Sequence, residues 1–188
     1  MNIGKYTHEE FMDLARSFHG YPAPGLIIGA YMVEMARKAL PEGILFDVIS
    51  ESKQCLPDAV QLLTLCTVGN GWLRVYDFGL YAVTLFDKHT GEGFRVHLDV
   101  SKMDDFSEIR TWFLKLKPKR EQDTPRLQEE IRLAAESILS IKPVTIKPEV
   151  LGHSSMGPIG QCPQCGEYHP VNYGAVCRSC QGEGPYTA

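Results

Sequence analysis

The sequence predicts an α+β fold in which helices pack on an antiparallel sheet, followed by a small C-terminal zinc module. Helical patterns occupy the start and the later part of the chain, an alternating hairpin pattern occupies the middle, and four cysteines gather near the end. Because helices and strands are segregated, a doubly wound fold is disfavoured. A shift to Gly, Pro, Ser and Cys predicts a core domain over residues 1–148 and a zinc-finger domain over 149–188.

Two helices are expected in the first part of the chain. Thr7 and Glu10 have the spacing of a capping box, so the first helix should start there and run to about Ser17. A second, mostly buried helix should follow the break at 19–25 and end before Pro41. Its apolar and small positions, which allow close packing, are Leu26, Gly29, Ala30, Val33, Ala36 and Leu40.

The middle of the chain predicts a strand, a helix and a hairpin. Residues 44–49 form a short apolar run that is typical of a buried strand. Pro57 is well placed to open a helix, which must have ended by Gly69. Residues 81–86 and 94–100 then predict a hairpin, since the second run alternates apolar and polar side chains and the linker has turn-forming residues.

A long helix is expected to begin at Thr124, directly before a proline. Its apolar stripe consists of Leu127, Ile131, Ala134, Ala135 and Ile138. Residues 142–148 predict a short strand or an extended linker, and the composition changes after them.

Composition and charge exclude several classes of protein. The chain has 188 residues and a formal charge of −4, which does not supply the basic surface of a general nucleic-acid binder. The basic cluster Lys115, Lys117, Lys119 and Arg120 is expected to be a solvated loop, with contact to RNA or an acidic partner as the alternative. The longest uncharged apolar region, residues 20–33, is interrupted by Pro and Gly and falls short of the roughly 20 residues of a membrane helix. No signal-peptide pattern opens the chain, so we expect a cytoplasmic protein.

Two C-x2-C pairs carry the most specific local signal, namely Cys162, Cys165, Cys177 and Cys180. Four thiolates at this spacing can wrap one tetrahedral zinc ion, and a closed four-sulfur site is structural rather than catalytic. A pair of disulfides, an iron–sulfur cluster or a redox pair are the alternatives. With four cysteines available, His169 is expected to be exposed rather than to act as a ligand. Residues 151–188 hold one Arg and no Lys, which disfavours an electrostatic DNA-binding finger.

Several short strings in the core occur together in one order. They are His19-Gly20 before Pro24-Gly25, Cys-x2-Asp-Ala at Cys55, Cys-Thr-x-Gly-Asn-Gly at Cys66, and Asp-x-Gly at Asp77. Together they resemble the family of the E subunit of formylmethanofuran dehydrogenase over most of residues 10–100. The resemblance implies an α+β core, an intertwined homodimer and, as in some members, a C-terminal treble-clef zinc finger. It also implies an association with molybdenum or tungsten enzymes of one-carbon metabolism.

The resemblance also implies a core site with metal-ligand or reactive positions. These are His19, Cys55 and Cys66, with Asp58, Asn70 and Asp77 nearby. An imidazole and two thiolates would suit zinc or another borderline-soft metal, so a second metal in the core is one expectation. The alternative is that the two cysteines are small buried hydrophobic residues and that the histidine ends a helix.

Helix geometry and three departures from the family pattern both argue against a complete metal site in the core of one chain. A continuous helix from Pro57 to Cys66 would separate Cys66 from Cys55, so both could bind one ion only if the helix broke or two subunits contributed. Members of the family commonly carry a second His, a Cys and a Lys where this chain has Tyr21, Ala23 and Leu80. These departures put catalysis in doubt more than the fold.

Three functions remain open from the sequence. The first is a zinc-binding accessory or sensor protein whose core takes a metal or small ligand and whose zinc module docks to a partner. The second is a metalloenzyme that uses His19 with Cys55 or Cys66 in a core cleft. The third is a regulator that binds a protein or nucleic acid through the zinc finger, which the acidic tail makes the weakest for nucleic acid.

Overall fold

The structure is a computed structural model that describes residues 2–152 and 155–186. It divides into two compact units, residues 1–151 and 152–188, which are described separately. The helices and strands of the first unit are α1 (His8–His19), α2 (Pro24–Ala39), β1 (Phe46–Ser50), α3 (Leu56–Leu63), β2 (Leu73–Val75), β3 (Ala82–Asp87), β4 (Glu92–Leu98), α4 (Ser107–Phe113), α5 (Thr124–Ala134) and β5 (Leu139–Thr145). The second unit contains β6 (Ile159–Gln161) and β7 (Tyr168–Pro170). No helix among the described residues has the length and apolar character needed to cross a membrane.

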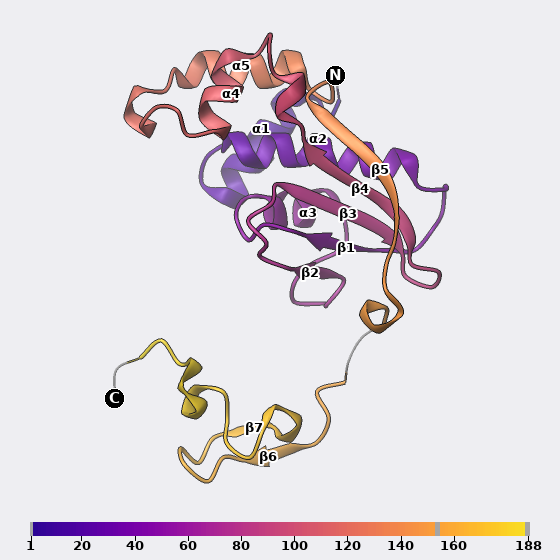
Figure 1. Cartoon of the computed structure of the whole chain (residues 1–188), viewed down its shortest axis with the longest axis vertical. Coiled ribbons are helices and arrows are strands. Elements are labelled where there is room, and N and C mark those ends of the chain that lie inside the picture. Colours follow the sequence, from indigo (N-terminus) through magenta and orange to yellow (C-terminus); the bar gives the residue numbers. More distant parts are fainter. Residues whose placement is uncertain (1, 153–154, 187–188) are drawn as a thin grey trace. The chain divides into compact units, whose positions relative to one another are not determined.

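The first unit is an α+β fold built on one five-stranded sheet (Figure 1). The strand order is β2-β1-β3-β4-β5, and all neighbouring pairs are antiparallel except β1 and β2. The predicted fold class and the β3–β4 hairpin are therefore confirmed. The alternating pattern begins at about Trp72, next to β2, but the sequence did not predict that β2 pairs in parallel with β1, with α3 as the connection between the two strands.

The capping box at the start of α1 is confirmed. The Thr7 hydroxyl accepts a hydrogen bond from the Glu10 backbone N–H at 3.2 Å, and the Glu10 carboxylate accepts one from the Thr7 N–H at 2.8 Å. The helix ends at Gly20, whose φ of 88° lies in the left-handed region that favours glycine. This ending makes His19 the last residue of α1, directly before the loop that leads into α2.

Helix α2 forms the centre of the core, as its apolar pattern predicts. Every residue from Gly25 to Glu34 is buried, and the helix packs against β3, β4, α3 and α5. A Cβ atom at Gly29 would lie 2.9 Å from Leu56 Cδ2 and 3.1 Å from Ala59 Cβ, so the glycine permits the close approach of α3. The helix ends at Ala39, before Pro41.

The two faces of the sheet have different chemistry. Val48, Val83, Leu85, Val96 and Leu98 point into the helical core. The opposite face carries charged side chains. There Arg95 and Glu51 form a bidentate ion pair with N–O distances of 2.6 and 2.7 Å. Residues 146–151 lie along this face, since the Arg74 guanidinium donates to the Val150 carbonyl and also contacts Asp47 at 3.1 Å.

The last helix of the first unit is shorter than predicted. Helix α5 ends at Ala134, because the positive φ of Ala135, 47°, does not continue the helix. Ala135 and Ile138 are therefore not on a helical stripe, although both are buried in the core. The strand expected within 142–148 begins earlier, at Leu139, and pairs with β4. Helix α4 was not predicted from the sequence.

We predict that Gly93→Ala lowers the stability of the first unit by about 2 kcal/mol, the usual cost of overpacking a core. A Cβ atom at Gly93 would lie 2.3 Å from the Leu85 carbonyl oxygen and 2.5 Å from Phe86 Cβ, so the strand backbone must shift. Gly69→Ala is the matched control, because the nearest atom to its Cβ would be 3.9 Å away. Urea unfolding of both variants measures the difference, and equal stabilities would contradict the prediction.

Candidate functional site

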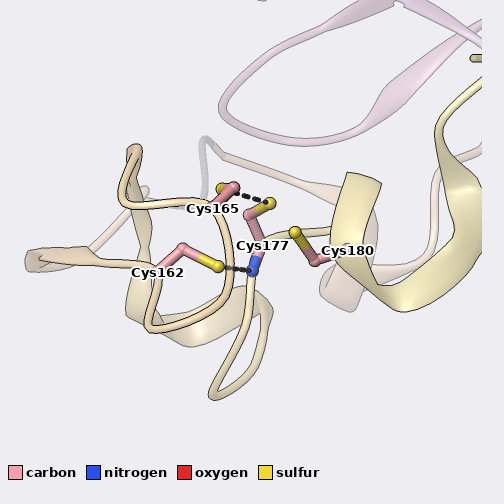
Figure 2. A group of neighbouring side chains, drawn as sticks. All are labelled: Cys162, Cys165, Cys177 and Cys180. Carbon is pink, nitrogen blue, oxygen red and sulfur yellow. Dashed lines mark hydrogen bonds between the residues drawn. The ribbon is translucent and has the colours of Figure 1, made fainter. Parts of the chain in front are cut away.

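Four cysteine sulfurs converge in the second unit (Figure 2). The Sγ atoms of Cys162, Cys165, Cys177 and Cys180 all lie within 4.8 Å of one another. A tetrahedral zinc site with bonds of about 2.3 Å requires sulfurs about 3.8 Å apart. The Cys165 and Cys177 sulfurs are 3.7 Å apart, which is the separation that zinc needs, and all four sulfurs are close enough together to share one ion. Because all four ligands come from the protein, such an ion would have no open position for catalysis.

Local backbone geometry prepares these sulfurs for metal binding. Cys162 and Cys165 lie in the turn of the β6–β7 hairpin, where Cys162 and Glu167 pair through their backbones at 2.8 Å. Cys180 lies in a helical turn over Ser179–Glu183, with Cys177 just before it. The Cys177 backbone N–H donates to Cys162 Sγ at 3.4 Å (Figure 2). This bond and others from backbone N–H groups lower the pKa of the Cys162 thiol to about 6, which favours the thiolate that zinc binds.

The position of His169 differs from the prediction. It lies on β7 and is only 8% exposed. Among the described residues of the second unit, the buried ones are Cys162, His169 and Cys177. Two of these three are cysteines of the cluster, so this unit has almost no apolar core.

In the first unit, the structure brings together His19 and Asp58, which are far apart in the sequence. His19 ends α1 and Asp58 lies in the first turn of α3, and His19 Nδ1 is 2.6 Å from Asp58 Oδ2. A carboxylate can only accept, so Nδ1 carries the proton and donates. When the ring is neutral, Nε2 is therefore the atom with a free lone pair.

Cys55 lies in a strained turn directly before α3. Its φ of 62° is in the left-handed region, and its half-buried thiol faces the first turn of α2. A Cβ atom at Gly25 would lie 3.1 Å from Cys55 Sγ and 2.6 Å from the Tyr81 hydroxyl oxygen, so only glycine fits there. Burial, together with the charge of Asp58, raises the pKa of the Cys55 thiol, although the Leu26 backbone N–H opposes this.

Cys55 and Asp77 line the same pocket, which has a volume of about 680 Å³. Lys53 enters this pocket from the β1–α3 connection and pairs with Asp77 at 2.8 Å. The hydrogen bond from Lys53 lowers the pKa of the Asp77 carboxyl. Tyr81 and Trp112 form an aromatic wall, with their rings perpendicular and 6.4 Å apart. The pocket therefore combines a thiol, an ion pair and aromatic surface.

Cys66 and Asn70 lie elsewhere. Helix α3 ends at Leu63, so it does not run on to Cys66, but within the described residues of one chain the two core cysteines do not belong to a group of three or more candidate metal ligands. Cys66 is buried, with its thiol 3.5 Å from the Phe46 carbonyl oxygen. Asn70 organises its own loop, because its side chain accepts from the Thr67 and Trp72 backbone N–H groups and donates to the Leu65 carbonyl. Within residues 2–152 and 155–186, the four tail cysteines are the only group of three or more His, Cys, Asp or Glu residues close enough to share an ion.

The three positions that depart from the family pattern lie near these groups. The Tyr21 ring lies 5.2 Å from the His19 ring, and Ala23 is buried at the start of α2. Leu80 is half exposed and holds no charge, whereas Lys53 supplies a cation at Asp77 from another segment. The pocket residues Lys53, Tyr81 and Trp112 were not among the predicted site residues, whereas Gly25 belongs to one of the strings that carry the family resemblance. Of the three, only Lys53, two residues before Cys55, could have been noticed from the sequence.

We predict that iodoacetamide modifies Cys55 before Cys66 in the zinc-loaded protein. Burial raises the pKa of the Cys66 thiol to about 11, so its thiolate forms only as the pH approaches that value. Cys55 is less buried and opens into the pocket. Peptide mass spectrometry after alkylation at pH 8 and pH 10 measures the order. Modification of Cys66 first would contradict it.

The comparison with protein families decides the classification. Residues 18–147 match the family described as "FmdE, Molybdenum formylmethanofuran dehydrogenase operon". The chain belongs to the FmdE family. Residues 153–187 match the FmdE treble clef zinc finger, in agreement with the hairpin and helical turn that carry the four cysteines. The resemblance identified from the core strings and the C-terminal zinc finger are both confirmed.

Two further proteins are similar to the chain. A protein from Syntrophus aciditrophicus, described as similar to the FmdE component of a tungsten formylmethanofuran dehydrogenase, is 55% identical, with a TM-score of 0.91 over 99% of this chain and 98% of that chain. A "Probable S-adenosyl-L-methionine-binding protein" from Archaeoglobus fulgidus is 29% identical over 81% of this chain. The chain spans 47% of the length of that second relative.

Proposed function

We propose that this FmdE-family protein is an accessory protein that binds a small ligand in the pocket beside Cys55. The pocket itself is the observation that carries the proposal, because it joins about 680 Å³ of space with Cys55, Asp77 and an aromatic wall. The raised pKa of the Cys55 thiol keeps it largely protonated at neutral pH, which suits ligand contact better than nucleophilic catalysis.

The names of the family and of one relative support an association of this protein with molybdenum or tungsten enzymes. The family description names a molybdenum formylmethanofuran dehydrogenase operon, and the Syntrophus relative is named after a tungsten enzyme. We therefore propose an association with molybdenum or tungsten enzymes of one-carbon metabolism, in the cytoplasm, where reducing conditions keep thiols free for zinc. In this proposal the protein is a homodimer, and the zinc finger contacts a protein partner rather than nucleic acid, since Arg178 is the only Lys or Arg among residues 151–188.

A fragment-binding experiment on the full chain tests the ligand role. The zinc-loaded, 15N-labelled protein is titrated with a fragment library that includes S-adenosylmethionine, which the name of the Archaeoglobus relative suggests. Bound compounds should shift the Cys55 amide and the Trp112 indole N–H signals, and alkylation of Cys55 should abolish their binding. A Cys66→Ser control should bind as the parent does. Binding that leaves both signals unchanged, or that survives alkylation, would refute the role.

A second candidate function is a core metal site at His19, which would make the protein a metal sensor or metalloenzyme. The 2.6 Å contact with Asp58 favours it, because metal-binding histidines usually donate their other ring N–H to a carboxylate. In that case Nε2 of His19 would be the ligand atom. Metal content per chain distinguishes this candidate from the first.

A further inference from the structure

The charges that line the pocket beside Cys55 do not balance. The lining includes two lysines, Lys53 and Lys115, and one carboxylate, Asp77. Asp77 is already paired with Lys53 at 2.8 Å. Lys115 makes no ion pair within the described part of the chain. One positive charge is therefore left without a partner at the pocket, and a lysine ammonium has three N–H donors, so Lys53 also retains donors for a ligand.

The backbone at Lys115 is held in a costly conformation. Its φ of 54° lies in the left-handed region, at the end of α4, where helices usually place glycine. Such a conformation is strained for a residue other than glycine. Backbone hydrogen bonds hold it, from Lys115 N–H to the Trp112 carbonyl at 3.3 Å and from Leu116 N–H to the Thr111 carbonyl at 3.0 Å. The turn thus brings a lysine, rather than a glycine, to the pocket.

The wall of the pocket beside these lysines is aromatic. Trp112 and Phe113 directly precede the Lys115 turn, and their rings lie 6.2 Å apart. The Tyr81 ring lies 6.1 Å from Phe113 and meets it edge-on. Such a wall suits a flat apolar group, which would gain burial and ring contacts beyond what an ion alone could gain.

We propose that the pocket takes a small carboxylate with a planar apolar body, with Lys53 and Lys115 binding the carboxylate and Trp112 contacting the body. This inference rests on the proposed ligand-binding function and specifies its ligand class. The carboxylate accepts hydrogen bonds from the free N–H groups of both ammonium ions, while Asp77 keeps Lys53 in place. The planar body covers the aromatic wall and closes off the space near Cys55.

Three probes with the same body and different charge test the proposal. They are 1-naphthoate, 1-naphthamide and 1-naphthylmethylammonium, titrated into the zinc-loaded full chain while the Trp112 indole N–H signal is followed. The signal is assigned with a Trp72→Phe variant, because Trp112 is then the only tryptophan. We expect 1-naphthoate to bind about tenfold more tightly than the amide, as a charged hydrogen bond allows, and the ammonium probe not to bind.

Lysine variants locate the charge effect. Lys53→Met and Lys115→Met should each weaken 1-naphthoate binding about tenfold and leave 1-naphthamide binding unchanged. Lys142→Met, an exposed lysine on β5, is the matched control and should change neither. Inorganic phosphate, which lacks a planar body, should not shift the Trp112 signal at the same concentrations.

The outcomes separate this inference from the function on which it rests. Equal binding of the three naphthalene probes at Trp112 would overturn the charge argument and leave the ligand-binding role standing. Binding of phosphate as tightly as 1-naphthoate would overturn the planar body. If neither these probes nor any compound of the fragment library shifts Trp112 or Cys55, the ligand-binding role itself fails.

Discussion

Chelation of zinc is expected to unfold residues 152–188 and to leave residues 1–151 folded. Among the described residues of the second unit, only His169 is buried in addition to two cysteines of the cluster. The unit therefore has too little apolar burial to fold without its metal. Structural zinc contributes about 10–16 kcal/mol of binding free energy at neutral pH in small zinc fingers, and this is also their folding free energy. The effect of zinc removal should be close to all-or-none for this unit.

Trypsin reports this unfolding at a single position. Arg178 is the only Lys or Arg among residues 151–188, and it lies between Cys177 and Cys180. Cleavage after Arg178 should be slow in the zinc-loaded protein and fast after chelation, and a Cys162→Ser variant should be cleaved rapidly without chelator. The thermal unfolding of residues 1–151 should not change. Resistance of Arg178 to trypsin in the metal-free protein would contradict the expectation.

The second large effect is expected from Glu51→Gln, which should destabilise the first unit by about 3 kcal/mol. The Glu51 and Arg95 side chains are only 10% and 19% exposed, and both carboxylate oxygens bind the guanidinium. Replacement by Gln leaves the Arg95 charge without its counter-charge on a largely dry face of the sheet. Urea unfolding of the variant measures the loss.

An exposed ion pair serves as the control for Glu51→Gln, and a double variant tests whether the unpaired charge causes the loss of stability. Glu129 and Arg132 form a similar ion pair, but their side chains are about half exposed, at 52% and 47%. Glu129→Gln should therefore cost less than about 1 kcal/mol. The double variant Glu51→Met, Arg95→Met should recover most of the lost stability, because it removes both charges. A loss in Glu51→Gln no larger than in Glu129→Gln would refute the argument.

Local signals in the sequence predicted much of the fold. Thr7 and Glu10 fix the start of α1 through contacts three residues apart, and Pro41 limits α2. The alternation in β4 marks a hairpin strand because one face of the sheet is buried. In contrast, β2 has three residues, and its parallel partner is set by α3 packing beneath the sheet. The left-handed turn at Ala135 also has no local signal, since alanine favours continuing the helix.

The candidate site residues also differ in whether local sequence signals predict them. The zinc ligands are predictable because each C-x2-C pair is a local unit and zinc requires four ligands. The resemblance to the FmdE family supplied His19, Cys55 and Asp58, but not their geometry. Part of the pocket wall comes from α4 and the turn after it, through Trp112 and Lys115, and only tertiary packing brings this segment beside Cys55. No spacing rule in the sequence could have joined these residues.

The zinc content per chain tests the central claim that the metal belongs to the four tail cysteines and the small ligand to the core pocket. Elemental analysis is made on the full chain, on Cys55→Ser, Cys66→Ser, and on Cys162→Ser, Cys177→Ser. The account predicts one zinc per chain in the first two proteins and none in the third. A second metal that is lost from the Cys55→Ser, Cys66→Ser protein, or one zinc that persists in the Cys162→Ser, Cys177→Ser protein, would contradict the account.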